Sequence, residues 1–209
     1  MPRPSKLGAV ILAAGGSRRM GLDKALLALP TGLGGEEGDT LVVSAVNRFH
    51  QICDIVVVVG GENAPALRAA RLAATLVVNP DPSRGQFSSL QIGLLELAKH
   101  NCDAGWITLV DCPAPALATL RALRDEFAAA ADAIWAVVPE YKGEHGHPYL
   151  AGSSLIDKLL EAPANASARE IRRRYQRHVR YLAVDDPRVV VNLNTPRDYQ
   201  RFGGTAVKS

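Results

Sequence analysis

A short stretch near the start of the chain combines residue types that could hold a polyphosphate. From Leu12 to Lys24 it reads L-A-A-G-G-S-R-R-M-G-L-D-K, which follows an apolar run typical of a buried strand. Gly15 and Gly16 allow unusual backbone angles, and backbone N–H groups beside them can approach an anion closely. Arg19 and Lys24 add positive charge to the same turn. An ordinary solvated turn would explain two glycines alone, but the whole combination predicts a polyphosphate-binding loop.

Two familiar phosphate-binding loops are absent from this stretch. It contains no G-x-x-x-x-G-K-[ST], so it is not a Walker A loop. It also lacks the G-x-G-x-x-G pattern of dinucleotide-binding folds. A nucleotide bound here would therefore be held by a different kind of loop.

The composition of the 209 residues is that of one globular domain. Hydrophobic residues make up 47% and charged residues 22%, and the net charge of +3 gives no argument for nucleic-acid binding. No apolar run approaches the ~20 residues that span a bilayer, and the N-terminus lacks a signal-peptide core. Three cysteines without a C-x-x-C pair indicate neither a disulfide framework nor a zinc site. We expect a cytoplasmic protein without a membrane or nucleic-acid partner.

Apolar strand patterns alternate with helical patterns along the chain, which predicts a three-layer α/β fold with a mostly parallel sheet. We expect a single domain over residues 1–209, with a mobile loop at 31–39 and a disordered tail at 203–209. Strands are predicted at 7–14, 55–59, 75–78, 106–110, 133–138, 179–184 and 188–191. Helices are predicted at 40–53, 64–73, 115–131, 153–160 and 167–175, with a last one after Thr195.

Candidate polar residues stand where several of these elements begin or end. Asp111 follows the strand at 106–110, beside the crevice where such sheets bind ligands, and could cap a helix or hold Mg²⁺ next to phosphates. Ser88 and Ser89 stand where a helix starts, as caps or as part of an anion site. Asn192 and Asn194 would share a face if the strand at 188–191 continued that far, although turn chemistry also explains them.

Two further polar groups have simpler explanations. His145 and His147 would share one face of a strand, but no third metal ligand stands at suitable spacing. The arginines between Arg169 and Arg180 are most simply a solvated helix face. An RNA-binding patch fits them less well because aromatic residues are few. A docking surface for an anionic pterin phosphate is the third explanation, and it ranks between the other two.

Five motifs in order resemble the nucleotidyltransferases that attach a nucleotide to the molybdenum-cofactor pterin, the cytidylyl- and guanylyltransferases. The first is L-x-x-G-x-x-x-R-M-G-x-x-K from Leu12 to Lys24. The others are G-Q-F-S-S-L-Q-I-G-L after the third strand, L-V-D-C-P around Asp111, G-H-P-Y-L around His147 and N-L-N-T-P-R-D near the end. The resemblance implies a Rossmann-like fold of the nucleotide-diphospho-sugar transferase type.

The resemblance also implies roles for these residues. Nucleotide would be bound by the loop and by the helix start, through Leu12, Ala13, Ala14, Gly15, Gly16, Arg19, Lys24, Ser88 and Ser89. Arg19, Lys24 and Asp111 would be catalytic, with Asp111 holding Mg²⁺. His147, Asn192 and Asn194 would contact the acceptor.

The expected reaction transfers a nucleoside monophosphate from an NTP to a phosphate on the acceptor, which the resemblance implies is molybdopterin, and releases pyrophosphate. The asparagines resemble the guanylyl branch, whereas Ala14, the S-S-L segment and G-H-P resemble the cytidylyl branch, so we favour CTP over GTP. A sugar phosphate or an isoprenoid-precursor phosphate is an alternative acceptor. A nucleotide-binding module without turnover is the alternative of another class.

Overall fold

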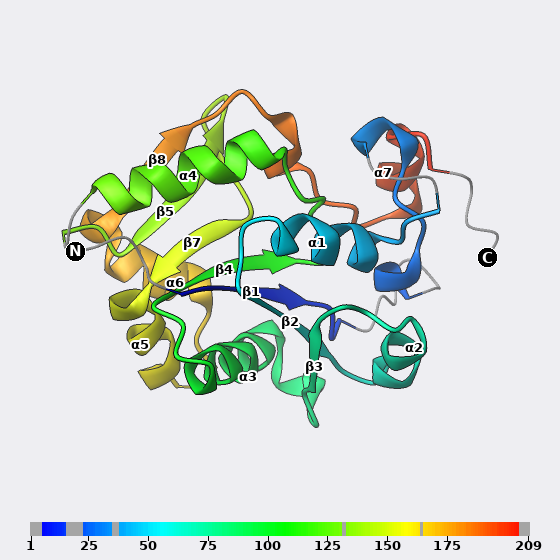
Figure 1. Cartoon of the computed structure of the whole chain (residues 1–209), viewed down its shortest axis with the longest axis horizontal. Helices are drawn as coiled ribbons and strands as arrows, with labels where there is room; N and C mark the ends of the chain where they lie inside the picture. Colours follow the sequence, from blue (N-terminus) through cyan, green and yellow to red (C-terminus); the bar gives the residue numbers. More distant parts are fainter. Residues whose placement is uncertain (1–5, 16–22, 35–37, 131–132, 164, 205–209) are drawn as a thin grey trace.

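A central β-sheet with helices on both faces forms the part of the chain described by the computed structural model, residues 6–15, 23–34, 38–130, 133–163 and 165–204 (Figure 1). The strands are β1 Leu7–Leu12, β2 Ile55–Gly60, β3 Thr75–Val78, β4 Ala104–Leu109, β5 Ala136–Tyr141, β6 Glu144–His145, β7 Tyr149–Gly152 and β8 Val179–Ala183. The α-helices are α1 Leu41–His50, α2 Ala64–Ala69, α3 Gln86–Lys99, α4 Leu117–Ala129, α5 Ser153–Glu161, α6 Ala168–Arg174 and α7 Pro196–Arg201. The predicted α/β architecture is confirmed.

The sheet order is β3-β2-β1-β4-β7-β5-β6, and β8 pairs with β5. The strands β1, β2, β3 and β4 are parallel, and β8 is parallel to β5, whereas β7 runs antiparallel to both β4 and β5. Strand β1 lies in the middle and is buried along its whole length, as its continuous apolar sequence requires. The sheet is therefore mixed but mostly parallel.

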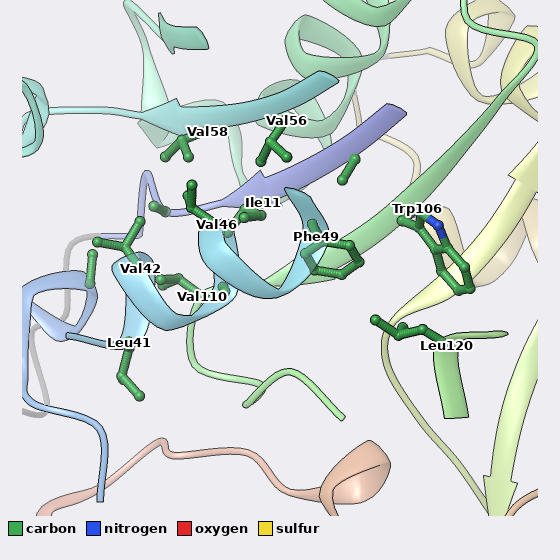
Figure 2. Close-up of a cluster of buried hydrophobic side chains, with 14 of the residues drawn as sticks. Ile11, Leu41, Val42, Val46, Phe49, Val56, Val58, Trp106, Val110 and Leu120 are labelled. Carbon is green, nitrogen blue, oxygen red and sulfur yellow. The ribbon is translucent and has the colours of Figure 1, made fainter. Parts of the chain in front are cut away.

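Two apolar layers fix the helices to the sheet. On one face, α1 packs its apolar side on β1 and β2, with Val42 and Val46 facing Ile11 and Val58 (Figure 2). On the other face, α3, α5 and α6 contribute to a second buried cluster. The carboxyl ends of the parallel strands lie at the edge of these layers, which is where such sheets bind ligands.

Several predicted element boundaries are correct because the local chemistry is explicit. Thr40 accepts a hydrogen bond from the N–H of Val43 at 3.3 Å and starts α1. Thr195 and Asp198 form a reciprocal capping box at the start of α7. These caps fix where α1 and α7 begin.

Two predictions of local structure are wrong. The strand predicted at 133–138 begins and ends later, because β5 runs from Ala136 to Tyr141 and forms a hairpin with β6 that turns at Lys142 and Gly143, both of which have positive φ. Residues 188–191 were predicted as a strand, but Pro187–Val190 is a 3-10 helix. The side chain of Asp186 accepts from the N–H of Arg188 at 3.1 Å and initiates that turn.

The first part of the predicted loop at 31–39 also has structure of its own. Thr31–Leu33 is a 3-10 helix with Leu33 buried, and the N–H of Gly32 donates to the carbonyl of Phe202 at 2.9 Å. Residues 35–37 and the tail residues 205–209 lie outside the described part of the chain. Within that part, no helix is both long and apolar enough to cross a membrane.

Gly93 allows α3 to lie directly on the sheet. A Cβ at this position would overlap with Cγ1 of Val10 in β1 and lie 2.9 Å from Cγ2 of Val59 in β2. We expect Gly93→Val to lower the free energy of unfolding by roughly 2–3 kcal/mol through overpacking, measured by urea denaturation. Leu95→Val on the exposed side of α3 is the control, and equal losses in both variants would contradict the close approach.

Candidate functional site

The candidate site lies where the carboxyl ends of β1, β2 and β4 meet. The chain leaves β1 toward β2 and β3 on one side, and β4 pairs with β1 on the other, so the strand order reverses at this point. Ligands bind at such reversal points in open α/β sheets. Figure 1 shows the arrows of β1 and β4 pointing to the side of the molecule where α7 lies.

Three polar side chains from distant segments converge there. The Nζ of Lys24 donates to Oδ2 of Asp111 at 2.8 Å and to Oδ1 of Asn194 at 3.1 Å. Only 12% of the Lys24 side chain and 16% of the Asp111 side chain are exposed, so solvent weakens this ion pair less than it would a surface pair. The structure therefore brings together three residues that the sequence placed in one site.

Each of the three is held by its own element. Lys24 begins the 3-10 helix Lys24–Leu26, whose cap is Asp23, with Oδ1 accepting from the N–H of Ala25 at 3.1 Å. Asp111 follows β4, and its carbonyl accepts from the N–H of Leu193 at 2.9 Å. The N–H of Asn194 donates to Asp198 in α7 at 3.1 Å. The ends of β1, β4 and the final loop are thus fixed relative to one another.

The two asparagines predicted together are separated by the structure. Asn194 is half-buried against Lys24, whereas Asn192 is exposed. They do not share a strand face, because the strand that would have carried them is the 3-10 helix Pro187–Val190 followed by an irregular segment. Asn194 is the asparagine next to Asp111.

The loop after β1 is described only in part. Leu12 and Ala13 continue the ladder, since the Leu12 carbonyl accepts from Val110 and the Ala13 N–H donates to Val59. Ala14 is buried and Gly15 is exposed at the carboxyl end of the strand. The predicted ligands Gly16 and Arg19 lie outside the described residues. The side chain of Leu12 is in the core, and a contact of this residue with nucleotide stays a prediction.

Ser88 and Ser89 lie in the first turn of α3 and do not cap it. The helix begins at Gln86 with Gly85 as its cap, two residues earlier than predicted. Both hydroxyls are buried and accept hydrogen bonds from Nδ2 of Asn79 at 2.9 Å. They fasten the end of β3 to α3, and any direct contact of these side chains with nucleotide stays a prediction.

His145 and His147 have different surroundings and do not form a pair. His145 is exposed and stacks on Tyr181, with ring centroids 3.8 Å apart. His147 is half-buried, and its Nδ1 lies 3.4 Å from the carbonyl oxygen of Ile107 in β4. Burial lowers the pKa of His147 to about 4, and the positive charge of Arg172 acts in the same direction. His147 is therefore neutral at pH 7.

This lowered pKa predicts a pH dependence of stability. The unfolded chain protonates His147 near pH 6.5, whereas the folded protein does so near pH 4. The free energy of unfolding should therefore fall as the pH drops through this window, with roughly 1–3 kcal/mol lost by pH 4. Urea denaturation across pH 4–7 should show a shallower loss in His147→Gln than in the wild type. An equal loss of stability with falling pH in the two proteins would contradict the lowered pKa of His147.

Asn63 is a site residue that the sequence did not single out. Its Nδ2 donates to the carbonyl of Ala13 at 2.9 Å and to Oδ2 of Asp23 at 2.8 Å, and its Oδ1 accepts from the N–H of Gly61 at 3.0 Å. It stands just after the carboxyl end of β2. Its position two residues after the paired glycines that end β2 was the sequence signal that could have identified Asn63 as a site residue.

The oxygen atoms at this site suit a hard cation. The carboxylate of Asp111 and the amide oxygen of Asn194 both face one point, the Nζ of Lys24. Mg²⁺ prefers such oxygen ligands and completes its shell with water and substrate phosphates. Among the residues that the structure describes, no three His, Cys, Asp or Glu side chains form a metal site. The donor set thus fits a metal shared with a phosphate ligand.

Comparisons with known proteins identify the family of this chain. The family model described as a MobA-like NTP transferase domain matches residues 9–180. A Synechococcus elongatus protein named "probable molybdenum cofactor guanylyltransferase" is 30% identical over 202 residues, which cover 92% of this chain and 95% of the relative.

Solved structures share the whole fold. The crystal structure of Rv0371c from Mycobacterium tuberculosis has a TM-score of 0.77 at 27% identity, covering 96% of this chain and 98% of that one. A manganese complex of the same protein has a TM-score of 0.73 at 25% identity, with 95% and 98% covered. A nucleotidyl transferase from Methanothermobacter, at 23% identity and a TM-score of 0.74, covers 95% of this chain and 96% of its own, and shows the same fold. The chain therefore belongs to the MobA-like NTP transferase family and is a nucleotidyltransferase.

Proposed function

We propose that this protein transfers a nucleoside monophosphate from a Mg²⁺-bound NTP to the phosphate of molybdopterin and releases pyrophosphate. The observation that carries the proposal is the convergence of Lys24, Asp111 and Asn194 at the carboxyl end of the parallel strands. A cation, a carboxylate and an amide oxygen at one point are the groups that a polyphosphate and its metal ion require.

The chemistry needs positioning and charge neutralisation more than covalent help. An oxygen of the acceptor phosphate attacks the α-phosphorus of the NTP and forms a new P–O bond. The bond from that phosphorus to the oxygen bridging to the β-phosphate breaks, and pyrophosphate leaves with the electron pair. Lys24 neutralises charge on the departing phosphates, together with Arg19 and the backbone N–H groups around Gly15 and Gly16.

The metal has a defined place in this proposal. Asp111 would hold Mg²⁺, with Asn194 as a neighbouring oxygen donor, directly or through water. When bound, the ion stabilises negative charge that develops on the phosphate oxygens. Because Lys24 contacts both of these oxygen atoms, the three side chains together would set the position of the triphosphate in this proposal.

The preferred base in this proposal is guanine. Motif resemblance favoured CTP, but the relative that is 30% identical over nearly the whole chain is named a guanylyltransferase. Asn192 and Asn194 resemble that branch as well. Cytosine remains the competing base, and the assay below compares the two directly.

The acceptor would approach from the side of His147. This side chain is neutral at pH 7, and because its Nδ1 faces the carbonyl oxygen of Ile107, its Nε2 is left as an uncharged hydrogen-bond acceptor. Arg172 of the basic helix α6 lies nearby, with its guanidinium carbon 4.3 Å from the centroid of the Tyr149 ring. On this side Arg172 supplies positive charge and His147 a neutral acceptor, and we assign the phosphorylated substrate to it.

Pyrophosphate release with a panel of acceptors tests the proposal. The panel contains molybdopterin, a sugar 1-phosphate and an isoprenoid-precursor phosphate, each with GTP, CTP, ATP and UTP in the presence of Mg²⁺. We expect turnover with molybdopterin, fastest with GTP. Turnover with another acceptor would reassign the substrate, and binding of NTP without turnover of any acceptor would make the protein a nucleotide-binding module.

A further inference from the structure

One side-chain amide joins the two ends of the nucleotide loop to the end of the neighbouring strand. The Nδ2 of Asn63 lies 2.9 Å from the carbonyl oxygen of Ala13 and 2.8 Å from Oδ2 of Asp23. Ala13 stands where the chain leaves β1, and Asp23 stands immediately before Lys24. The same nitrogen atom therefore holds both the entrance and the exit of the loop.

The orientation of this amide is fixed by its partners. Both N–H bonds of Nδ2 are directed to acceptors, and Oδ1 accepts from the N–H of Gly61 at 3.0 Å. A flipped amide would face its oxygen toward a carbonyl and a carboxylate. Gly61 allows the chain after β2 to lie close to the start of the nucleotide loop, because a Cβ at Gly61 would lie 3.0 Å from the carbonyl oxygen of Ala14. The contact is thus specific for asparagine at this position.

Asp23 transmits this constraint to the catalytic lysine. Its Oδ2 accepts from Asn63, and its Oδ1 caps the 3-10 helix by accepting from the N–H of Ala25 at 3.1 Å. Lys24 is the first residue of that helix and reaches Asp111 from there. With Asn63 removed, one oxygen of Asp23 loses its partner and the cap is held by the other alone.

We infer that Asn63 is a positioning residue that sets the Lys24 ammonium against Asp111 by clamping Ala13 and Asp23. It touches neither substrate nor metal in this role, and it acts through Asp23. The inference rests on the proposed function for its kinetic consequence, whereas the placement of Lys24 can be measured without any substrate.

Kinetics and chemical labelling together test the inference on the full chain. We expect Asn63→Ala and Asp23→Ala each to lower kcat/KM for the NTP about tenfold. Because both act on the same contact, the double variant should lose no more than the worse single variant. Asn63→Ala should add nothing further in the Lys24→Ala background. Asn63→Asp should be worse than Asn63→Ala, because a carboxylate would then face the carboxylate of Asp23.

Reductive methylation followed by peptide mass spectrometry reports on Lys24 directly. We expect Lys24 to react several-fold faster in Asn63→Ala than in the wild type, whereas the exposed Lys99 should react at the same rate in both. Asn47→Ala on the exposed side of α1 is the matched control and should change neither readout.

The outcomes separate the inference from the proposed function. A wild-type protein without turnover of any acceptor would overturn the proposed function, and the methylation rates would then decide the inference alone. Unchanged Lys24 methylation in both Asn63→Ala and Asn63→Asp would overturn the inference. Additive kinetic losses in the double variant would show that Asn63 acts independently of Asp23, and this result would also overturn the inference.

Discussion

Lys24→Ala is expected to lower kcat for pyrophosphate release by on the order of 10²–10³ while leaving the fold intact. The ammonium is held by Asp111 and Asn194 at 2.8 and 3.1 Å, so it is already placed where the phosphates would gather. Removing it takes away charge that we expect to stabilise the departing pyrophosphate more than the bound NTP. Single-turnover rates at saturating NTP, together with a thermal unfolding curve, measure the effect.

Lys99→Ala is the control for this variant. Lys99 is exposed and pairs with Glu96 one helical turn away, so its loss should change the rate by less than twofold. A Lys24→Ala protein that keeps wild-type kcat and differs only in thermal stability would remove Lys24 from the catalytic machinery.

Asp111→Asn should give a comparable loss of rate with a different signature. The substitution keeps the shape of the side chain but removes the negative charge that we propose holds Mg²⁺. We expect a fall in kcat on the order of 10²–10³ and a rise of about tenfold or more in the Mg²⁺ concentration needed for half-maximal rate. Initial rates across a Mg²⁺ titration provide both quantities.

Asp125→Asn serves as the matched control, because this exposed carboxylate on α4 contacts only the neighbouring Arg124 among the hydrogen bonds and ion pairs found in the described residues. Its Mg²⁺ dependence should equal that of the wild type. If Asp111→Asn requires no more Mg²⁺ than the wild type, the metal is held elsewhere and Asp111 serves only to orient Lys24.

The parts of the fold that sequence reasoning predicted correctly are those with strong local signals. The apolar runs of β1, β2 and β4 and the caps at Thr40 and Thr195 required no knowledge of the tertiary structure. The errors fall where tertiary pairing decides. Strand β7 lies antiparallel between β4 and β5, and a short segment such as Tyr149–Gly152 carries no signal for that placement.

The candidate site was predictable to a similar extent. Residue type and position singled out Lys24, Asp111 and Asn194, the family resemblance implied their roles, and the structure brings them together. Asn63 was missed because its contacts with Ala13 and Asp23 join segments far apart in sequence. Asn192, by contrast, was predicted in the site but lies apart from Asn194. The predicted strand would have placed both asparagines on one face, but the chain there forms the 3-10 helix Pro187–Val190.

Isothermal titration of the Mg²⁺ complexes of GTP, CTP, ATP and UTP into the wild type and Lys24→Ala tests the central claim most directly. The account predicts that the wild type binds a triphosphate, with GTP the tightest, and that Lys24→Ala weakens the binding of every NTP by about tenfold or more. A uniform loss is expected because we propose that Lys24 binds the phosphates and not the base. Equal affinity of the two proteins for all four nucleotides would contradict a polyphosphate site at the end of β1.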